Sequence, residues 1–235
     1  MDRGFNDCQI SRLTDIPRST VREWRHAPTG RYGRRGWSDP DCPTCNQATV
    51  DGSTYAYLLG LYLGDGCISA LPRGVYKLRI IMDARYHGII EECAIAMRGV
   101  RPSTDMKVGR VRNPGCIEIC AHWKHWPCLF PQHGPGRKHE RKIELQPWQL
   151  SIVDRHPDRL LRGLIHSDGY RGPNYVNGKS YPRYQFSNRS KDIRDIFCRA
   201  CDVYGVRWRQ MNRWVISIAR APDVAKLDDI IGPKS

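Results

Sequence analysis

The sequence predicts an α+β fold of two similar halves, with a small helical module ahead of them. A nine-residue string occurs twice, as LLGLYLGDG over residues 58–66 and as LRGLIHSDG over residues 161–169, with the copies 103 positions apart. Each copy is an apolar helical pattern ending in Asp-Gly, followed by the same predicted order of strands, a helix, a hairpin and a last helix. Such a repeat is typical of a pseudo-two-fold pair whose helices share one interface.

Four segments are expected along the 235 residues, which suffice for one large domain or two small ones. They are a helix-turn-helix module over residues 1–28, a basic linker over residues 29–50, a first repeat over residues 51–145 and a second repeat over residues 146–235. This division predicts that both copies of the string lie in the body of the protein.

The net charge of the chain indicates which classes of partner it binds. Lys and Arg number 38 against 24 Asp and Glu, which gives a net charge of +14. This excess indicates a polyanionic partner, nucleic acid first and an anionic membrane surface second. The longest apolar run, residues 55–63, is too short to span a bilayer, and the N-terminus lacks the apolar segment of a secretory signal. We expect a cytoplasmic protein whose ten cysteines are free thiols or metal ligands.

The N-terminal module shows the spacing of two short helices around a TDIP turn. Asn6 or Asp7 can cap the first helix, which is expected to bury Ile10 and Leu13. The second helix, with its T-V-x-x-W string, resembles the small winged or resolvase-type modules. Its exposed face would carry the DNA-contacting groups Arg18, Ser19, Arg22 and Arg25. The alternative is a helical hairpin with a solvated basic face.

The elements of the two repeats are expected in parallel order. In the first repeat Ser53 can cap the leading helix, and Gly66 would end it in the left-handed conformation. Pro157 opens the corresponding helix of the second repeat. The expected first-repeat elements are a helix over 54–65, a strand over 76–82, a helix over 86–97 and a hairpin of 106–112 with 116–122. Their counterparts are a helix over 158–168, a strand over 183–187, a helix over 191–204 and a hairpin of 206–211 with 214–218.

Small residues line one face of each leading helix. Gly60 and Gly64 lie four apart in the first, and Gly163 and Ser167 do the same in the second. Small side chains at this spacing let two helix backbones approach closely. The two helices are therefore expected to run side by side.

Residues 51–235 resemble the LAGLIDADG homing endonuclease family, on the strength of two motif copies at this separation, each followed by an αββαββα-like order. The resemblance implies a monomeric pseudo-dimer in which the motif helices form the interface and deliver one acid each to paired active sites. It also implies two antiparallel sheets that form a saddle over double-stranded DNA. The matching acids are Asp65 and Asp168.

Two adjacent carboxylates at helix C-termini repel each other unless a cation lies between them. Mg²⁺, or Mn²⁺, suits oxygen ligands from Asp65 and Asp168, and the resemblance implies that the carbonyls of Gly64 and Ser167 also contribute. The implied chemistry is in-line hydrolysis of one phosphodiester in each strand by metal-activated water. The alternative for each Asp alone is an ordinary helix end before a capping glycine.

Some residues depart from the family pattern or match it loosely. Arg162 replaces a small residue and fits if it faces outward, and His166 stands where an acid is common, either as a metal neighbour or as a core residue. The family often adds a basic residue near the end of the last hairpin strand. Lys124 is the best match in the first half, with Arg220 or Lys226 in the second, and plain surface charge is the alternative.

Alternation along the strands places basic and amide side chains on one face of each sheet. Such groups read base edges and hold phosphates, unless the face is merely solvated. The residues are Lys77 and Arg79 in the first repeat and Arg183, Gln185, Arg207 and Arg209 in the second. Arg137 and Lys138, in the segment joining the halves, are expected on a phosphate-facing loop.

Cysteine spacing suggests one zinc site. Cys42 and Cys45 form a C-x2-C knuckle without an obvious second pair nearby. The segment 122–142 is rich in histidine, but its spacing matches no standard zinc ligand set, so DNA contact and packing are favoured there: His122, His125, Cys128, His133 and His139. Cys198 and Cys201 share the C-x2-C spacing within a predicted helix and are expected to be buried core thiols.

The leading hypothesis is a site-specific, Mg²⁺-dependent, double-strand DNA endonuclease of the homing type. The first alternative is a DNA-binding regulator, since some sporulation regulators combine such a fold with a helix-turn-helix and have lost cleavage. An RNA maturase and a zinc-stabilised scaffold are the remaining alternatives. The C-terminal GPKS string lacks a His-Asn ending, so we expect a free-standing chain rather than an intein.

Overall fold

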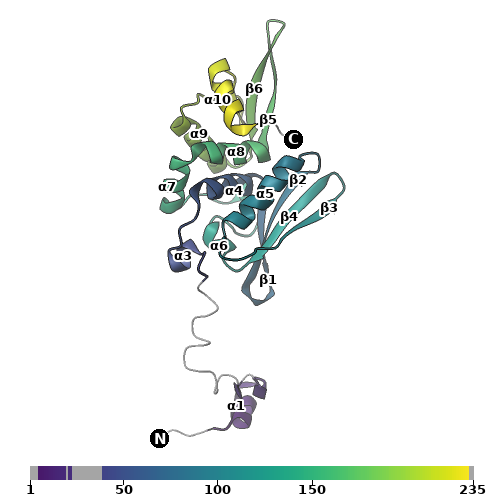
Figure 1. The fold of residues 1–235 in the computed structure, drawn as a ribbon, viewed down its shortest axis with the longest axis vertical. Coiled ribbons are helices and arrows are strands. Elements are labelled where there is room, and N and C mark those ends of the chain that lie inside the picture. Colours follow the sequence, from purple (N-terminus) through teal and green to yellow (C-terminus); the bar gives the residue numbers. More distant parts are fainter. Residues whose placement is uncertain (1–4, 20, 23–38, 233–235) are drawn as a thin grey trace. The chain divides into compact units, whose positions relative to one another are not determined.

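The structure is a computed structural model that describes residues 5–19, 21–22 and 39–232 (Figure 1). It divides into two compact units, Met1–Pro40 and Asp41–Ser235. The division places the C-x2-C knuckle at the start of the second unit, in the segment expected to be a linker. Among the described residues, no helix combines the length and the apolar character needed to cross a membrane.

The first unit contains helix α1 (Asp7–Thr14), which begins at the predicted cap Asn6. The Asn6 side chain accepts from the Gln9 backbone N–H at 2.9 Å, and the Gln9 side chain accepts from the Asn6 N–H at 2.9 Å. Leu13 was expected to be buried, but 70% of it is exposed. Arg18, Ser19 and Arg22 are exposed in the short helical stretch that follows, and Arg25 lies outside the described residues. The helix-turn-helix therefore stays a prediction.

The second unit repeats one order of elements twice, which confirms the predicted fold class. The first repeat consists of α4 (Gly52–Asp65), β1 (Gly66–Leu71), β2 (Val75–Asp83), α5 (His87–Gly99), β3 (Val108–Asn113), β4 (Cys116–Trp123) and α6 (Trp126–Leu129). The second consists of α8 (Pro157–Asp168), β5 (Gly169–Val176), β6 (Lys179–Ser187), α9 (Lys191–Tyr204), β7 (Arg209–Gln210), β8 (Val215–Ile218) and α10 (Ala221–Ile231). The connecting elements are α3 (Pro43–Asn46), η1 (Pro72–Gly74), η2 (Lys138–Glu140) and α7 (Pro147–Arg155).

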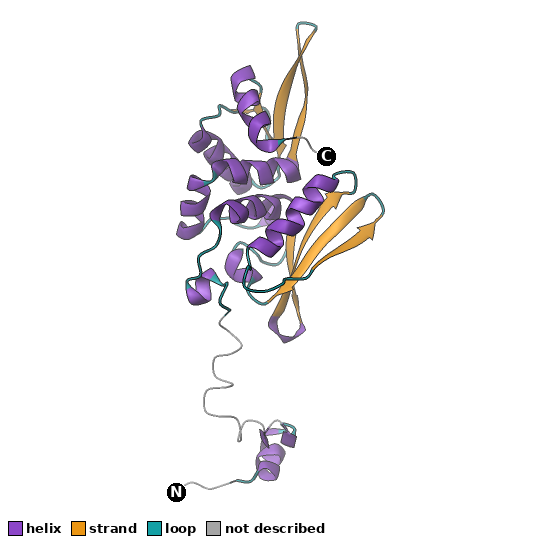
Figure 2. Cartoon of the chain, viewed as in Figure 1, coloured by secondary structure: helices purple, strands orange, loops and turns teal. Residues whose placement is uncertain are grey.

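Each repeat forms a four-stranded antiparallel sheet with the same strand order, β1-β2-β4-β3 in the first and β5-β6-β8-β7 in the second. Helices cover one face of each sheet (Figure 2). Leu78 and Ile80 of β2 point into the core beneath the helices, as do Tyr184 and Phe186 of β6. Since side chains alternate along a strand, the intervening residues lie on the open face of each sheet.

Helices α4 and α8 run side by side through the middle of this unit (Figure 1). A Cβ atom at Gly60 would lie 2.7 Å from the Leu160 carbonyl oxygen, and one at Gly163 would overlap the Tyr57 carbonyl oxygen. The two backbones therefore touch where each helix has a glycine, as the spacing of small residues predicts. Helix α4 is buried from residue 55 to residue 63, which explains its continuous apolar sequence.

Two local predictions were wrong. Gly66 does not adopt a left-handed conformation, because its φ is −82° and the chain passes directly from α4 into β1. Glycine is needed there for space, since a Cβ atom would lie 2.7 Å from the Tyr62 carbonyl oxygen. The cap of α4 is Asp51 rather than Ser53, with its carboxylate accepting from the Thr54 N–H at 2.9 Å.

Candidate active site at the paired helix ends

The C-terminal ends of α4 and α8 meet at one edge of the helix pair. A Cβ atom at Gly64 would overlap the Ser167 side chain and would lie 3.1 Å from the Asp168 carboxylate. Asp65 and Ser167 also line one pocket of about 370 Å³. The structure thus brings together the two ends that carry the motif acids.

The two acids differ in their surroundings. Asp65 is exposed, whereas Asp168 is partly buried and accepts a hydrogen bond from Asn188 Nδ2 at 2.6 Å. Both follow helix turns whose last carbonyl groups point outward without a helical partner, and these carbonyls make the site more negative. The site therefore favours a cation between or beside the carboxylates.

Lys138, on η2, supplies one such cation. Its ammonium donates to the last carbonyl groups of α4, at 2.6 Å to Tyr62, 2.9 Å to Leu63 and 2.6 Å to Gly64. The sequence places Lys138 on an open phosphate-facing loop, but the structure folds it onto the end of α4. Arg137, its neighbour, does lie outside, with 74% of its side chain exposed.

The pKa of Lys138 reports its place in the site. Burial lowers this pKa to about 8, while the negative charges of Asp168 and Asp65 act in the opposite direction. The charges of both carboxylates thus favour the protonated, positively charged form of Lys138. No sequence motif marks Lys138, because 74 residues separate it from the carbonyl of Gly64 that it contacts.

Lys124, the residue favoured by sequence, lies elsewhere on the first repeat. Gly66 pairs with Ile80, and Ile80 pairs with Ile119, so Ile119 is level with the end of α4. Lys124 follows Ile119 by five residues and is exposed in the turn after β4. At about 3.3 Å a residue, this is roughly 17 Å of extended chain. Lys138 is therefore the better-placed basic residue.

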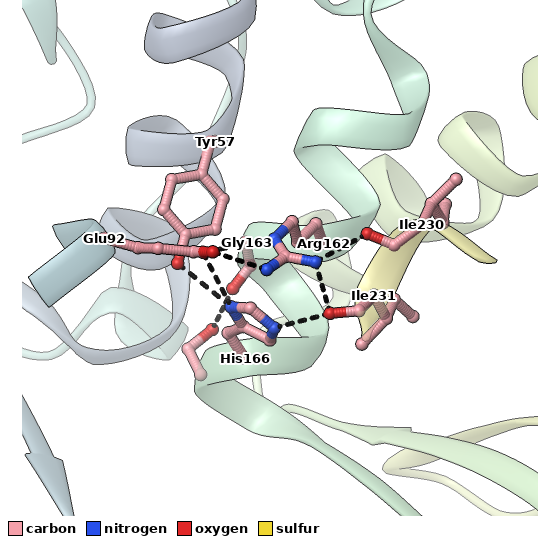
Figure 3. Close-up of polar contacts among 8 residues, drawn as sticks. Tyr57, Glu92, Arg162, Gly163, His166, Ile230 and Ile231 are labelled. Carbon is pink, nitrogen blue, oxygen red and sulfur yellow. Dashed lines mark hydrogen bonds and ion pairs between the residues drawn. The ribbon is translucent and has the colours of Figure 1, made fainter. Parts of the chain in front are cut away.

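His166 is a core residue that also lines the pocket of Asp65 and Ser167. Its side chain is fully buried. Its Nδ1 lies 3.0 Å from the Tyr57 hydroxyl and 3.9 Å from a Glu92 oxygen, and its Nε2 lies 3.1 Å from the Ile231 carbonyl oxygen (Figure 3). The histidine thereby connects α8 with α4, α5 and the end of α10.

Arg162 does not face outward as its place in the motif suggested. It donates to Glu92 at 2.6 Å and to the Ile230 carbonyl at 2.8 Å, and also to the Ile231 carbonyl (Figure 3). Burial raises the pKa of Glu92, but the hydrogen bond and charge of Arg162 outweigh burial, so this pKa lies below its ordinary value. Arg162 therefore caps α10 and fixes it to α5, behind the site.

The oxygen atoms at the helix ends suit a hard divalent cation. Asp65 and Asp168 offer carboxylates, and Gly64 and Ser167 offer backbone carbonyls. The Gly64 oxygen already accepts from Lys138 at 2.6 Å, but a carbonyl oxygen has two lone pairs. Oxygen-only sites of this kind, completed by water and phosphate, are typical of Mg²⁺ and Mn²⁺.

Comparison with known proteins gives a fold rather than a close relative. No family model and no curated protein matches the chain. Variants of the homing endonuclease I-DmoI superpose with a TM-score of 0.54 at 19% identity, over 77% of this chain and 97% of theirs. I-DmoI in complex with DNA and Mn superposes with a TM-score of 0.52 at 17% identity, over 77% of this chain and 98% of that one. The chain has the two-repeat LAGLIDADG fold.

The open face of the first LAGLIDADG sheet carries the predicted basic pair on β2. Lys77 pairs with Glu118 at 2.6 Å, and this contact raises the pKa of Lys77. Arg79 donates to the Ser69 hydroxyl at 2.8 Å. Both side chains are therefore held along the sheet by neighbouring strands.

The second LAGLIDADG sheet carries a groove of about 610 Å³ over the residues predicted to contact DNA. Four arginines line it: Arg183, Arg207, Arg209 and Arg220. Arg183 donates to Asn174 at 3.2 Å, and Arg207 pairs with Asp223 at 3.0 Å. Gln185, on the same face, donates to the Met211 sulfur at 3.3 Å. Arg183 and Gln185 lie on β6 and Arg209 on β7, whereas Arg207 precedes β7 and pairs with a residue of α10. The contact of these residues with DNA stays a prediction.

Four possible metal ligands meet at the edge of the first LAGLIDADG repeat. Cys42 and Cys45 lie with His125 and Cys128, and their ligand atoms are all within 4.8 Å of one another. In the sequence these residues belong to a knuckle and to a separate histidine-rich segment, because about 80 positions lie between them. Cys198 and Cys201 are buried in α9, as predicted.

Proposed function

We propose that the protein is a site-specific, metal-dependent endonuclease that cleaves double-stranded DNA. The observation that carries this proposal is the meeting of the last turns of α4 and α8, each of which ends in an acid. I-DmoI, which shares the fold, has been crystallised with DNA and Mn. The shared fold supports the proposal, and the acid pair identifies the residues proposed to bind the metal.

The catalytic groups of this proposal surround the junction. Asp65 and Asp168 bind Mg²⁺ or Mn²⁺ together with the carbonyls of Gly64 and Ser167. When bound, the cation neutralises the scissile phosphate and promotes ionisation of the attacking water. Lys138 holds a positive charge beside the same carboxylates and stabilises the charge that develops on the phosphate. Lys124 remains a weaker candidate for that role.

The DNA-binding surface of this proposal consists of the open faces of the two sheets. Phosphate contacts position a duplex, and arginine or glutamine side chains read base edges. The net charge of +14 and the arginine-lined groove support this assignment. The protein acts as a monomer, since both halves of the site lie in one chain. The exposed Arg18, Ser19 and Arg22 add contacts from the N-terminal unit.

The test is cleavage of a genomic or randomised DNA library in Mg²⁺. We compare the wild-type protein with Asp65→Asn combined with Asp168→Asn. Discrete double-strand breaks that disappear in the double variant are expected. Asp154→Asn is the matched control, because it removes one acid that pairs with Arg199 at 2.7 Å in another part of the body. It should leave cleavage intact.

Two outcomes would contradict the proposal. Tight, salt-sensitive DNA binding without cleavage, unchanged by the double substitution, identifies a DNA-binding regulator. Cleavage that persists in the double variant removes the assignment of the two acids.

A further inference from the structure

Two short helical turns present the Cys and His side chains at the edge of the first repeat. Cys42 is the N-cap of α3, and Cys45 lies within that helix. His125 is the N-cap of α6, and Cys128 lies within that one. Each turn thus supplies two side chains three residues apart, and α3 contacts α6.

The distances within the cluster match a tetrahedral site. Cys45 Sγ lies 3.4 Å from His125 Nδ1 and 4.0 Å from Cys128 Sγ, and Cys128 Sγ lies 3.7 Å from His125 Nδ1. Zn–S bonds of about 2.3 Å and Zn–N bonds of about 2.0 Å place tetrahedral ligand atoms roughly 3.5 to 3.8 Å apart. The three distances among Cys45, His125 and Cys128 are within a few tenths of an ångström of these values, and Cys42 Sγ lies within 4.8 Å of the other ligand atoms.

The surroundings hold the ligands in place. The Cys45 backbone N–H donates to Cys42 Sγ at 3.3 Å, a contact that orients and stabilises a thiolate. The Thr44 hydroxyl donates to the Cys128 carbonyl at 3.4 Å, which connects the two turns. Cys42 is fully buried, whereas Cys45 is exposed, so an ion can enter from one side.

We propose that Cys42, Cys45, His125 and Cys128 form a structural zinc site. Three thiolates and one imidazole are a soft donor set that selects Zn²⁺ over Mg²⁺. The site supplies four protein ligands and leaves no position for substrate, which distinguishes it from a catalytic zinc centre. It is independent of the cleavage chemistry proposed for the helix ends.

The proposed zinc site would stabilise the short helix α3 and hold it against the first repeat. Helix α3 has four residues, too few to be stable through its own hydrogen bonds. Residues 47–50 alone separate it from Asp51, the cap of α4. The zinc site therefore fixes residues 42–46 to the first repeat, just ahead of α4. A second contact supports this attachment, since Asp41 accepts from the Ser103 N–H at 3.3 Å.

The test measures the metal content of the full chain, purified without chelators. One zinc per chain is expected by elemental mass spectrometry. Cys45→Ser combined with Cys128→Ser should lose it. Cys198→Ala is the matched control, because it interrupts a second C-x2-C pair at the same spacing and should retain zinc. Cobalt substitution should give the thiolate charge-transfer band of tetrahedral Co²⁺ in the wild type and not in the double variant.

A second variant separates loss of metal from loss of folding. Cys128→His keeps a zinc ligand and should retain the metal, whereas Cys128→Ser should lose most of it. Removing zinc with a chelator should lower Tm by roughly 5 °C or more, because the metal binds only the folded site. The same chelator should leave the Tm of the Cys45→Ser, Cys128→Ser variant unchanged.

Three results overturn the proposal. One is a wild-type protein that contains no zinc and binds added Zn²⁺ no more tightly than the double variant. Another is zinc content that does not fall in the double variant. The third is a disulfide between any two of the three cysteines as the state of the freshly purified, active chain, since it would remove two ligands.

Discussion

The two motif helices share a sequence pattern and differ in how their ends are held. Helix α4 is buried along most of its length, and Lys138 covers the carbonyls at its end. Helix α8 carries Arg162 and His166 on the side that faces α5 and α10, and its acid, Asp168, is held by Asn188. The fold is thus nearly symmetric, while the polar groups around the two acids are not.

Under the proposed function, this difference predicts unequal tasks for the two acids. The carboxylate of Asp168 is oriented by a neutral amide, and the end of α4 is neutralised by an ammonium. A single mutation near one acid should therefore affect the two DNA strands unequally. Three experiments test this contrast between the helices.

Lys138→Met should have the largest effect. Removing the ammonium leaves the carbonyls of α4 without their donor and removes one of the two positive charges proposed to act on the phosphate. We expect cleavage to fall on the order of 100-fold, with one strand cut much more slowly than the other. The measurement is the rate of each strand's cleavage on a duplex labelled at both ends.

Two controls frame this result. Lys142→Met removes an exposed lysine from the same segment and should leave the rates unchanged. Lys124→Met tests the competing basic residue. If Lys124→Met reduces cleavage more than Lys138→Met does, the assignment of Lys138 is wrong.

Gly163→Ala should be the most damaging change to the helix interface. The added methyl group would overlap the Tyr57 carbonyl oxygen, whereas a methyl group at Gly60 would lie 2.7 Å from the Leu160 oxygen. We expect the free energy of unfolding to fall by about 3 kcal/mol for Gly163→Ala and by about 2 kcal/mol for Gly60→Ala. Denaturant unfolding measures both. Gly109→Ala, where the nearest atom is 3.4 Å away, is the control and should cost the least.

Glu92→Gln should have the smallest effect, and one that depends on pH. The folded pKa of Glu92 lies below its ordinary value of 4.5. The ionised carboxylate therefore stabilises the fold above pH 4.5, and this contribution is lost as pH falls through the folded pKa. The difference in Tm between wild type and Glu92→Gln should be constant near neutral pH and shrink in acid. A difference that does not change with pH would rule out the ionised pair with Arg162.

The sequence predicted those features that depend on local patterns. The repeated motif, the two apolar helices and the alternating strands predicted the fold class, and Gly60 with Gly163 predicted the close approach of the helices. Features made by distant residues were missed. Lys138 reaches α4 from a loop without periodicity, and Arg162 is directed inward by carbonyls of α10, which lies about 68 positions further on.

The candidate zinc site was half predicted for the same reason. The C-x2-C spacing of Cys42 and Cys45 is a local signal, but His125 and Cys128 join it only through the folding of β4 back toward α3. Gly66 shows a different limit. A glycine after a helix predicts left-handed backbone, whereas the structure requires glycine here for space beside Tyr62.

The contact between Gly60 and Gly163 also bears on how such a protein can change its target. At Gly60 and Gly163 the two repeats touch through backbone atoms of α4 and α8. At this contact no pair of side chains has to be complementary. Each sheet can then acquire new residues on its open face without a compensating change in the other. Under the proposed function, each sheet would contact its own half of a DNA site, and the residues on its open face could be changed separately from those of the other sheet.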